Sequence, residues 1–182
     1  LPFQAVHVPV QTPQEFTQKY MGVYDAGWQE LREQRQARAK QLGIVPADSA
    51  MVTMSSTNDW DAYSAEEQRY HAKRMAVYAG MVDAMDHHIG RLIDYLKSTG
   101  QYDNTIFIFT SDNGSEASGG DSPRHPLMQL ALRVQGYNND YDTLGLKGSF
   151  NTIGPSFASA AASPLAYYKF YAGEGGMRVP LI

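Results

Sequence analysis

The chain has 182 residues, of which 43% are hydrophobic and 19% are charged, a composition typical of one globular domain. Its 15 basic and 19 acidic residues give a net charge of -4, which argues against binding to nucleic acid or to an anionic membrane. No stretch reaches the roughly 18–20 apolar residues that a transmembrane helix needs. The absence of cysteine excludes disulfides, thiolate metal sites and a cysteine nucleophile within this chain.

The first ten residues, LPFQAVHVPV, have alternating and β-branched character and predict a short strand that ends near Pro9. His7 lies at the exit of this strand, between two valines. A single histidine in such a place is commonly a structural residue held by hydrogen bonds. The alternative is a catalytic role, because histidine titrates near neutral pH.

Two helices are expected next. The pattern Thr-Pro-x-Glu that starts at Thr12 predicts a capping box and a short helix to about Tyr20. Residues 26–42 are rich in helix-forming residues and precede Gly43, which is a common helix stop. We therefore expect a second and longer helix there, with its basic residues on a solvated face.

The clearest expected helix begins at Ser64, where Ser-Ala-Glu-Glu forms a second capping box, and it ends at Gly100. Apolar residues recur within it at helical spacing, namely Met75, Tyr78, Ala79, Val82, Met85, Ile89, Leu92, Ile93 and Leu96. Three histidines also fall on this helix, namely His71, His87 and His88. They lack the HExxH spacing, which argues against a zinc protease.

A short turn then leads into TIFIFTS, residues 105–111. Its four consecutive apolar residues lack two-fold alternation and predict a strand buried on both faces. Helix, turn and buried strand form an α/β unit, and parallel sheets place ligands at the carboxyl ends of their strands. Asp112 and Asn113 follow directly, with oxygen ligands of the kind that Ca²⁺ or Mg²⁺ prefers. The alternative is an ordinary turn, because Asn-Gly is a strong turn signal.

Residues 115–166 are rich in Gly, Ser, Asn and Asp and predict a long loop, with only residues 126–135 expected to be helical. Loops of this length are commonly functional or disordered. The chain closes with AYYKFYAGEGGMRVPLI, in which Lys169 stands among aromatic residues before a glycine turn and strand-like residues. Lys169 is either a surface lysine whose stem covers the rings or a fixed cation for an anionic substrate.

Four stretches, taken in order, resemble the sulfatase family, in particular its bacterial arylsulfatase branch within the alkaline-phosphatase-like superfamily. They are AVHVPVQTP, YDAGWQELREQR, AGMVDAMDHHIGRLIDYLKSTGQYDNTIFIFTSDNGSE and YKFYAGEGGMRVPLI. The combination of T-S-D-N-G with K-x-x-x-x-E-G-G is highly specific, although each piece alone is not. The resemblance implies an α/β fold with a large mixed sheet sandwiched between helices.

The resemblance also implies a site and a reaction. It implies that Asp112 and Asn113 hold part of a Ca²⁺ site, and that His7 and Lys169 contact the sulfate group of a small-molecule sulfate ester and assist its leaving oxygen. Cleavage of a sulfate ester spreads negative charge over several oxygens, which preorganised cations stabilise where water is excluded. His7 would act as a general acid toward the departing oxygen.

Two features of the family are missing from the chain. One is the C/S-x-P-x-R motif, whose cysteine or serine becomes the formylglycine nucleophile, and the other is a pair of acidic calcium ligands. Both lie upstream in the family, so residues 1–182 are expected to be a fragment of a single sulfatase catalytic domain, truncated at both ends. Since Ca²⁺ takes about six to eight ligands, we expect the isolated chain to bind Ca²⁺ weakly and to be inactive.

Two other functions stay open. One is a phosphodiesterase or phosphonate hydrolase of the same superfamily, and the other is a non-catalytic, degenerate sulfatase-like protein that binds calcium or a partner. A periplasmic or secreted location follows from the habit of the family, and no signal peptide is visible in the chain. The residues predict neither a particular sulfate ester nor a particular oligomeric state.

Overall fold

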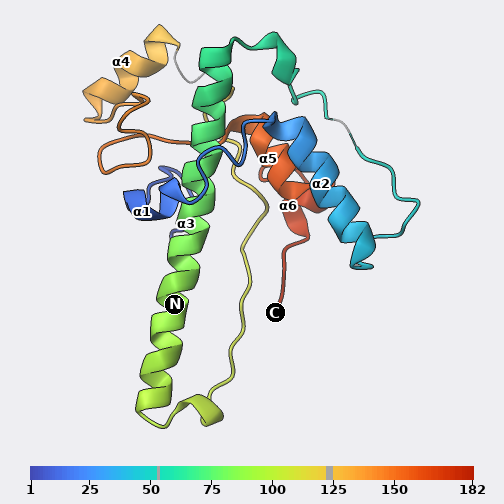
Figure 1. The fold of residues 1–182 in the computed structure, drawn as a ribbon, viewed down its shortest axis with the longest axis vertical. Coiled ribbons are helices and arrows are strands. Elements are labelled where there is room, and N and C mark those ends of the chain that lie inside the picture. The colour runs from blue at the N-terminus through green and yellow to red at the C-terminus, as the bar shows by residue number, and fades with distance from the viewer. Residues whose placement is uncertain (53, 122–124) are drawn as a thin grey trace.

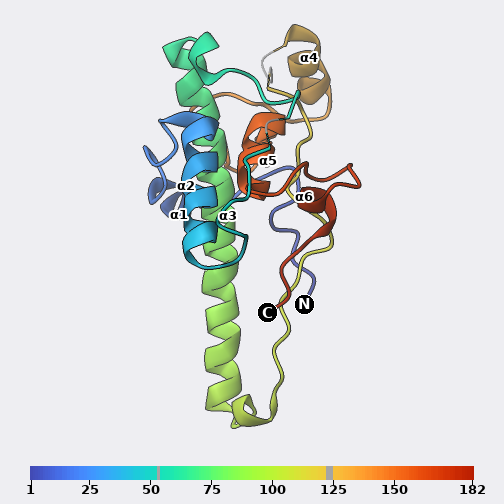
Figure 2. The ribbon, with the colours of Figure 1, turned by 90° about the vertical axis from the view of Figure 1, so that its right-hand side faces the viewer.

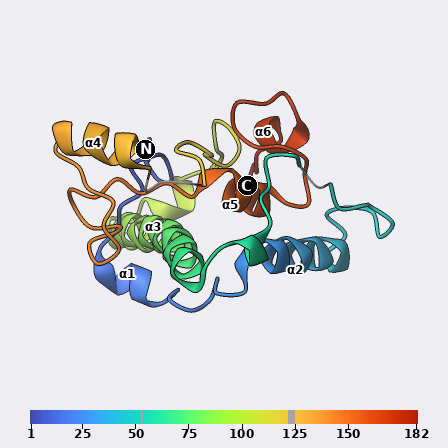
Figure 3. The ribbon, with the colours of Figure 1, turned by 90° about the horizontal axis from the view of Figure 1, so that it is seen from above.

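The computed structural model describes residues 1–52, 54–121 and 125–182, and their regular structure is helical. The elements, in chain order, are α1 (Gln14–Gln18), α2 (Gly27–Gln41), η1 (Trp60–Ala62), α3 (Ala65–Ser98), η2 (Tyr102–Asn104), α4 (Pro126–Val134), α5 (Gly154–Ala162) and α6 (Glu174–Met177). Figure 1 shows α3 running along the molecule, with α2, α5 and α6 on one side of its first half. Seen from above in Figure 3, α4 lies apart from that group. The second half of α3 extends beyond the other α-helices in Figure 2.

The long helix α3 begins as the sequence predicts. The Ser64 side chain accepts a hydrogen bond from the Glu67 backbone N–H, and the Glu67 carboxylate accepts one from the Ser64 N–H at 2.9 Å. Both halves of the capping box are therefore present. Gly100, with a φ of +67°, follows the helix end, as expected for a residue that stops a helix in the left-handed conformation.

Two further helices are confirmed, and the start of a third differs from expectation. The bounds of α2 and α4 agree with the predicted ranges to within about one residue. The capping box predicted at Thr12 is wrong, because the Thr12 hydroxyl donates to the Gly80 carbonyl oxygen of α3, at 3.3 Å. This tertiary contact competes with capping, and α1 covers only Gln14–Gln18.

The helix α5 lies in the segment that was expected to be a loop. It has a proline in its first turn and a run of alanines, and alanine is the strongest helix former. Its residues Phe157, Ala158 and Ala160 are fully buried. Residues 122–124, which also belong to the expected loop, lie outside the described residues.

The structure overturns the predicted α/β fold with a large mixed sheet. Within the three described ranges no strand or sheet forms, and the pairing outside the helices is confined to two isolated bridges. These bridges join Thr110 to Leu181 and Asn138 to Ser149. The first ten residues, expected to contain a strand, form turns and irregular chain instead.

The segment that was predicted to be a buried strand shows why no sheet forms. Residues 106–109 are exposed, including Ile106 at 89% and Ile108 at 73%. A strand becomes part of a sheet only when neighbouring chains pair with its backbone. Here Phe109 exchanges backbone hydrogen bonds of 2.8 and 3.0 Å with Ile182, and the pairing extends no further than the adjacent bridge.

The core lies between α2, η1, α5 and the first half of α3. Trp28 on α2 is 1% exposed and meets four other rings edge-on, those of Trp60, Tyr63, His71 and Phe157. Its ring centroid lies 4.6 Å from that of Trp60, 5.3 Å from that of Phe157 and 5.5 Å from that of His71. Such edge-to-face aromatic pairs add to the stabilisation that burial provides. The cluster therefore joins α2 and α5, which are distant in sequence, to η1 and the start of α3.

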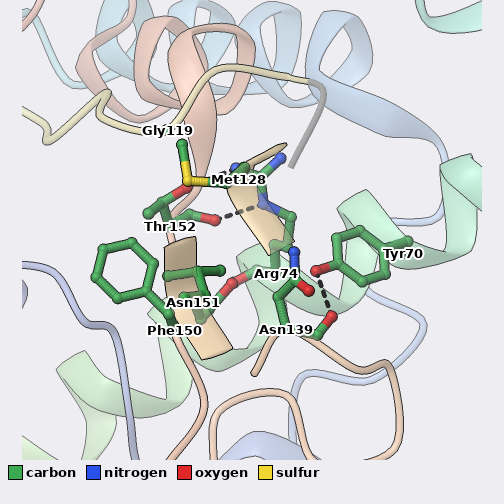
Figure 4. Close-up of a pocket in the computed structure, with 9 residues that line it drawn as sticks. Tyr70, Arg74, Gly119, Met128, Asn139, Phe150, Asn151 and Thr152 are labelled. Carbon is green, nitrogen blue, oxygen red and sulfur yellow. Dashed lines mark hydrogen bonds between the residues drawn. The ribbon is translucent and has the colours of Figure 1, made fainter. Parts of the chain in front are cut away.

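A buried polar network lies beside this aromatic core (Figure 4). The Arg74 guanidinium, 1% exposed, donates to the carbonyl and hydroxyl oxygens of Thr152, at 2.5 and 2.6 Å, and to the Gly120 carbonyl oxygen at 3.1 Å. It also lies 3.0 Å from His71 Nδ1. The network ties α3 to the segments that contain Gly120 and Thr152. In the described part of the chain, no helix combines the length and apolar character needed to cross a membrane.

Candidate functional site

Two of the predicted site residues, His7 and Lys169, meet in space although 162 positions separate them. Lys169 Nζ lies 2.8 Å from His7 Nε2 and 2.6 Å from Glu116 Oε2. His7 Nε2 lies 3.5 Å from the same carboxylate oxygen. We call these three side chains the His-Lys-Glu cluster.

Close backbone packing places Lys169 beside the segment that follows Asn113. The Lys169 N–H donates to the Ser115 carbonyl oxygen at 3.1 Å, and the Gly114 N–H donates to the Gly176 carbonyl oxygen at 2.9 Å. A β-carbon on Gly114 would collide with the carbonyl oxygen of Gly175. Glycine therefore lets the Asp-Asn-Gly turn lie directly against α6.

The three side chains of the cluster differ in exposure. The Glu116 side chain is 6% exposed, that of Lys169 is 19% exposed and that of His7 is 54% exposed. Burial alone would raise the pKa of Glu116, but hydrogen bonds from Lys169 and Ser118 hold this pKa below its usual value. The carboxylate is therefore charged near neutral pH and balances the ammonium. The cluster opens to solvent on the His7 side.

Glu116 is a member of the cluster that the sequence patterns do not predict. It stands three positions after Asn113, inside the quoted stretch SDNGSE, where only the Asp-Asn pair was assigned a role. Its signal was indirect, because a lysine that becomes buried among aromatic residues needs a carboxylate partner. Nothing in the sequence showed that this partner was Glu116, 53 positions away.

Asp112 and Asn113 precede the cluster, with Asp112 exposed and Asn113 half-buried. Among the described residues, the side-chain polar contacts of His7 and Lys169 run to each other, to Glu116 and to Val8, and they do not include this pair. Carboxylate and amide oxygens are suitable for Ca²⁺, which takes about six to eight oxygen ligands. No group of three or more His, Cys, Asp or Glu side chains that could hold a metal occurs in the described ranges. The pair thus fits part of a calcium site and does not complete one.

Comparison with known proteins identifies the family. The whole chain, residues 1–182, matches the family model described as Sulfatase. It is 41% identical over 184 residues to an uncharacterized sulfatase of Schizosaccharomyces pombe, a match that covers 100% of this chain and 33% of that protein. It is 38% identical over 181 residues to the arylsulfatase of Klebsiella aerogenes, covering 97% of this chain and 38% of that protein. The chain belongs to the sulfatase family, which confirms the resemblance seen in its four stretches.

The comparisons also define how far the similarity extends. The chain spans 33% and 38% of the lengths of these two relatives. A shorter match, 46% identical over 62 residues and covering 34% of this chain, relates it to the multifunctional alkaline phosphatase superfamily protein PehA of Trinickia caryophylli. The match to the Schizosaccharomyces pombe protein spans the positions of His7, Glu116 and Lys169, because it covers the entire chain.

Proposed function

We propose that this chain forms part of a sulfuric ester hydrolase of the arylsulfatase type and supplies the imidazole and the ammonium that contact the sulfate group. The observation that carries the proposal is the contact of 2.8 Å between His7 Nε2 and Lys169 Nζ, in a chain that matches the sulfatase model along its whole length. The proposed substrate is a small-molecule sulfate ester. A periplasmic or secreted location is part of the same proposal.

The charge distribution of the cluster supports this assignment. A sulfate ester is an anion, and its cleavage moves additional negative charge onto the departing oxygen. A positioned cation stabilises that charge most effectively where water is partly excluded. The Lys169 side chain is 19% exposed and is held on its inner side by Glu116, so its outer side can face an anion. His7 is the most exposed member of the cluster and lies where that anion would enter.

The nucleophile and the complete metal site are proposed to lie outside residues 1–182. The chain has no cysteine and no S-x-P-x-R sequence. A formylglycine supplied from elsewhere would provide the attacking oxygen, and the residues of this chain would bind and orient the ester. Asp112 and Asn113 are proposed to add ligands to a shared Ca²⁺ site, where the ion would neutralise charge on the substrate.

Hydrolysis by a chimera tests the function. Residues 1–182 replace the matching segment of the Klebsiella aerogenes arylsulfatase, and hydrolysis of an aryl sulfate is measured. We expect the chimera to be active. Substitution Lys169→Met should lower kcat/KM by about 100-fold, because it removes one positioned cation from the site. The exposed Lys147→Met, which makes the same chemical change outside the cluster, is the matched control and should leave kcat/KM unchanged.

The alternatives give different outcomes in this assay. A folded chimera that cleaves a matched aryl phosphate faster than the aryl sulfate favours the phosphodiesterase or phosphonate hydrolase. A folded chimera that cleaves neither ester favours the non-catalytic protein. An equal rate for Lys169→Met and Lys147→Met would show that the ammonium does not contact the reacting group. Circular dichroism of each variant establishes that it is folded.

Calcium binding by the isolated chain tests the metal proposal separately. Two side-chain donors are too few to hold Ca²⁺, so titration calorimetry should show binding weaker than about 1 mM. Substitution Asp112→Ala should remove the residual heat, whereas Asp103→Ala, which changes another exposed aspartate nearby, should not. Binding in the micromolar range, or the same heat in the Asp112→Ala variant, would mean that the calcium ligands lie elsewhere.

A further inference from the structure

We propose that Glu116 is a positioning residue whose carboxylate holds the Lys169 ammonium against His7 Nε2, and that this contact keeps His7 in the neutral tautomer with its proton on Nδ1. This role of Glu116 rests on the proposed function only in that the anion bound by the cluster is taken to be a sulfate ester. With His7 in this form, Lys169 presents its remaining N–H to an oxygen of the sulfate ester.

The two hydrogen bonds of His7 define its tautomer. A lysine ammonium has three N–H donors and no acceptor, so His7 Nε2, at 2.8 Å, has to accept with its lone pair. The other ring nitrogen, Nδ1, lies 2.9 Å from the Val8 carbonyl oxygen, which can only accept. Nδ1 therefore carries the proton. Both contacts require the same neutral form of the ring.

Glu116 is the anchor because it is the most constrained member of the cluster. Its side chain is 6% exposed, and its second oxygen, Oε1, accepts from the Ser118 N–H at 2.8 Å and from the Ser118 hydroxyl. Lysine, in contrast, has a flexible four-carbon stem that adopts many positions unless its ammonium is held. The contact of 2.6 Å between Glu116 Oε2 and Lys169 Nζ is charge-assisted, and it fixes the direction of the ammonium.

The geometry leaves one donor of Lys169 for a ligand. One N–H is directed to Glu116 and a second to His7, so within the described ranges the third has no side-chain acceptor and can meet an anionic oxygen. The Phe170 ring, whose centroid lies 5.5 Å from Nζ, covers part of the remaining surface. Without the carboxylate, both the direction of this third N–H and the contact with His7 would be lost.

Nitrogen NMR of the isolated chain tests the proposal without requiring activity. Protonated and unprotonated ring nitrogens of histidine have well-separated ¹⁵N shifts, and at about pH 8.5 histidine is neutral. We expect His7 to show a protonated Nδ1 and an unprotonated Nε2. In Glu116→Gln, which keeps the shape of the side chain but removes its charge, the Nε2-protonated tautomer should appear. Glu174→Gln is the matched control, because Glu174 is exposed and pairs with Arg178 outside the cluster.

The outcomes separate this inference from the proposed function. Two results would overturn the inference, regardless of whether the chimera hydrolyses an ester. One is that His7 carries its proton on Nε2 in the unchanged chain. The other is that His7 has the same tautomer in the Glu116→Gln variant as in the unchanged chain. Lys169→Met offers a second variant if Glu116→Gln does not fold. The Nε2-protonated tautomer of His7 should appear in this variant too. In the arylsulfatase chimera Glu116→Gln should lower kcat/KM by about 10-fold or more. A chimera without hydrolysis counts against the sulfatase proposal, and the NMR result still decides the tautomer.

Discussion

Replacing Arg74 by alanine is expected to lower the free energy of unfolding by about 3–5 kcal/mol, the usual cost of removing one member of a buried charged network. The Arg74 side chain is almost fully buried and donates to both oxygens of Thr152 and to the Gly120 carbonyl oxygen. It also meets Nδ1 of His71. Without the guanidinium these buried acceptors lose their donor, and each unsatisfied group costs about 1–3 kcal/mol.

Urea denaturation followed by tryptophan fluorescence measures this effect, since Trp28 lies in the adjacent core. The control is Arg38→Ala on the exposed face of α2, which should change the free energy of unfolding by less than about 0.5 kcal/mol. A loss below about 1 kcal/mol for Arg74→Ala would mean that water replaces the guanidinium at its acceptors, and that the network is not required for the packing of α3.

Acidification is expected to destabilise the chain through His71. Burial, reinforced by the nearby Arg74 cation, lowers the pKa of His71 to about 3 from an unfolded value of about 6.5. As the pH falls below 6.5, the unfolded chain binds a proton that the folded chain rejects. Stability is therefore lost progressively from about pH 6.5 down to about pH 3. The expected loss is about 2 kcal/mol between pH 7 and pH 5.

Urea denaturation at pH 7, 6 and 5 measures the loss. His71→Asn removes the titration while its amide oxygen can still accept from Arg74, so this variant should lose about 2 kcal/mol less than the unchanged chain over the same interval. The difference between the two proteins in the free energy of unfolding removes the contribution of the carboxyl groups that titrate in both. His88→Asn changes an exposed histidine of the same helix. In this variant the free energy of unfolding should change with pH as it does in the unchanged chain. Parallel curves for the unchanged chain and His71→Asn would show that His71 titrates normally.

Local signals in the sequence predicted most of the helices correctly. The capping box at Ser64 and the glycine stop at Gly43 act through neighbouring residues, so a single stretch of sequence contains the information. The prediction failed where a distant partner intervened. The Thr12 hydroxyl bonds to Gly80 on another helix, and α5 owes its burial to packing against α2.

The predicted buried strand failed for a related reason. Four apolar residues at 106–109 indicate a segment that could be buried on both faces, but burial requires chain on both sides of it. In the structure only the end of this segment pairs, with Leu181 and Ile182, and the rest is exposed. The apolar pattern is visible in the segment itself, whereas a sheet forms only where neighbouring chain pairs with the backbone of the segment.

By itself the sequence determined the sulfatase family, the main helices and the two candidate residues His7 and Lys169. Only the tertiary structure decided that these two side chains touch, that Glu116 holds the ammonium and that the described residues form no sheet. The physical reason is the range of the interactions. Caps and helical periodicity act over a few residues, while a contact between positions 7 and 169 exists only after the chain has folded around its core.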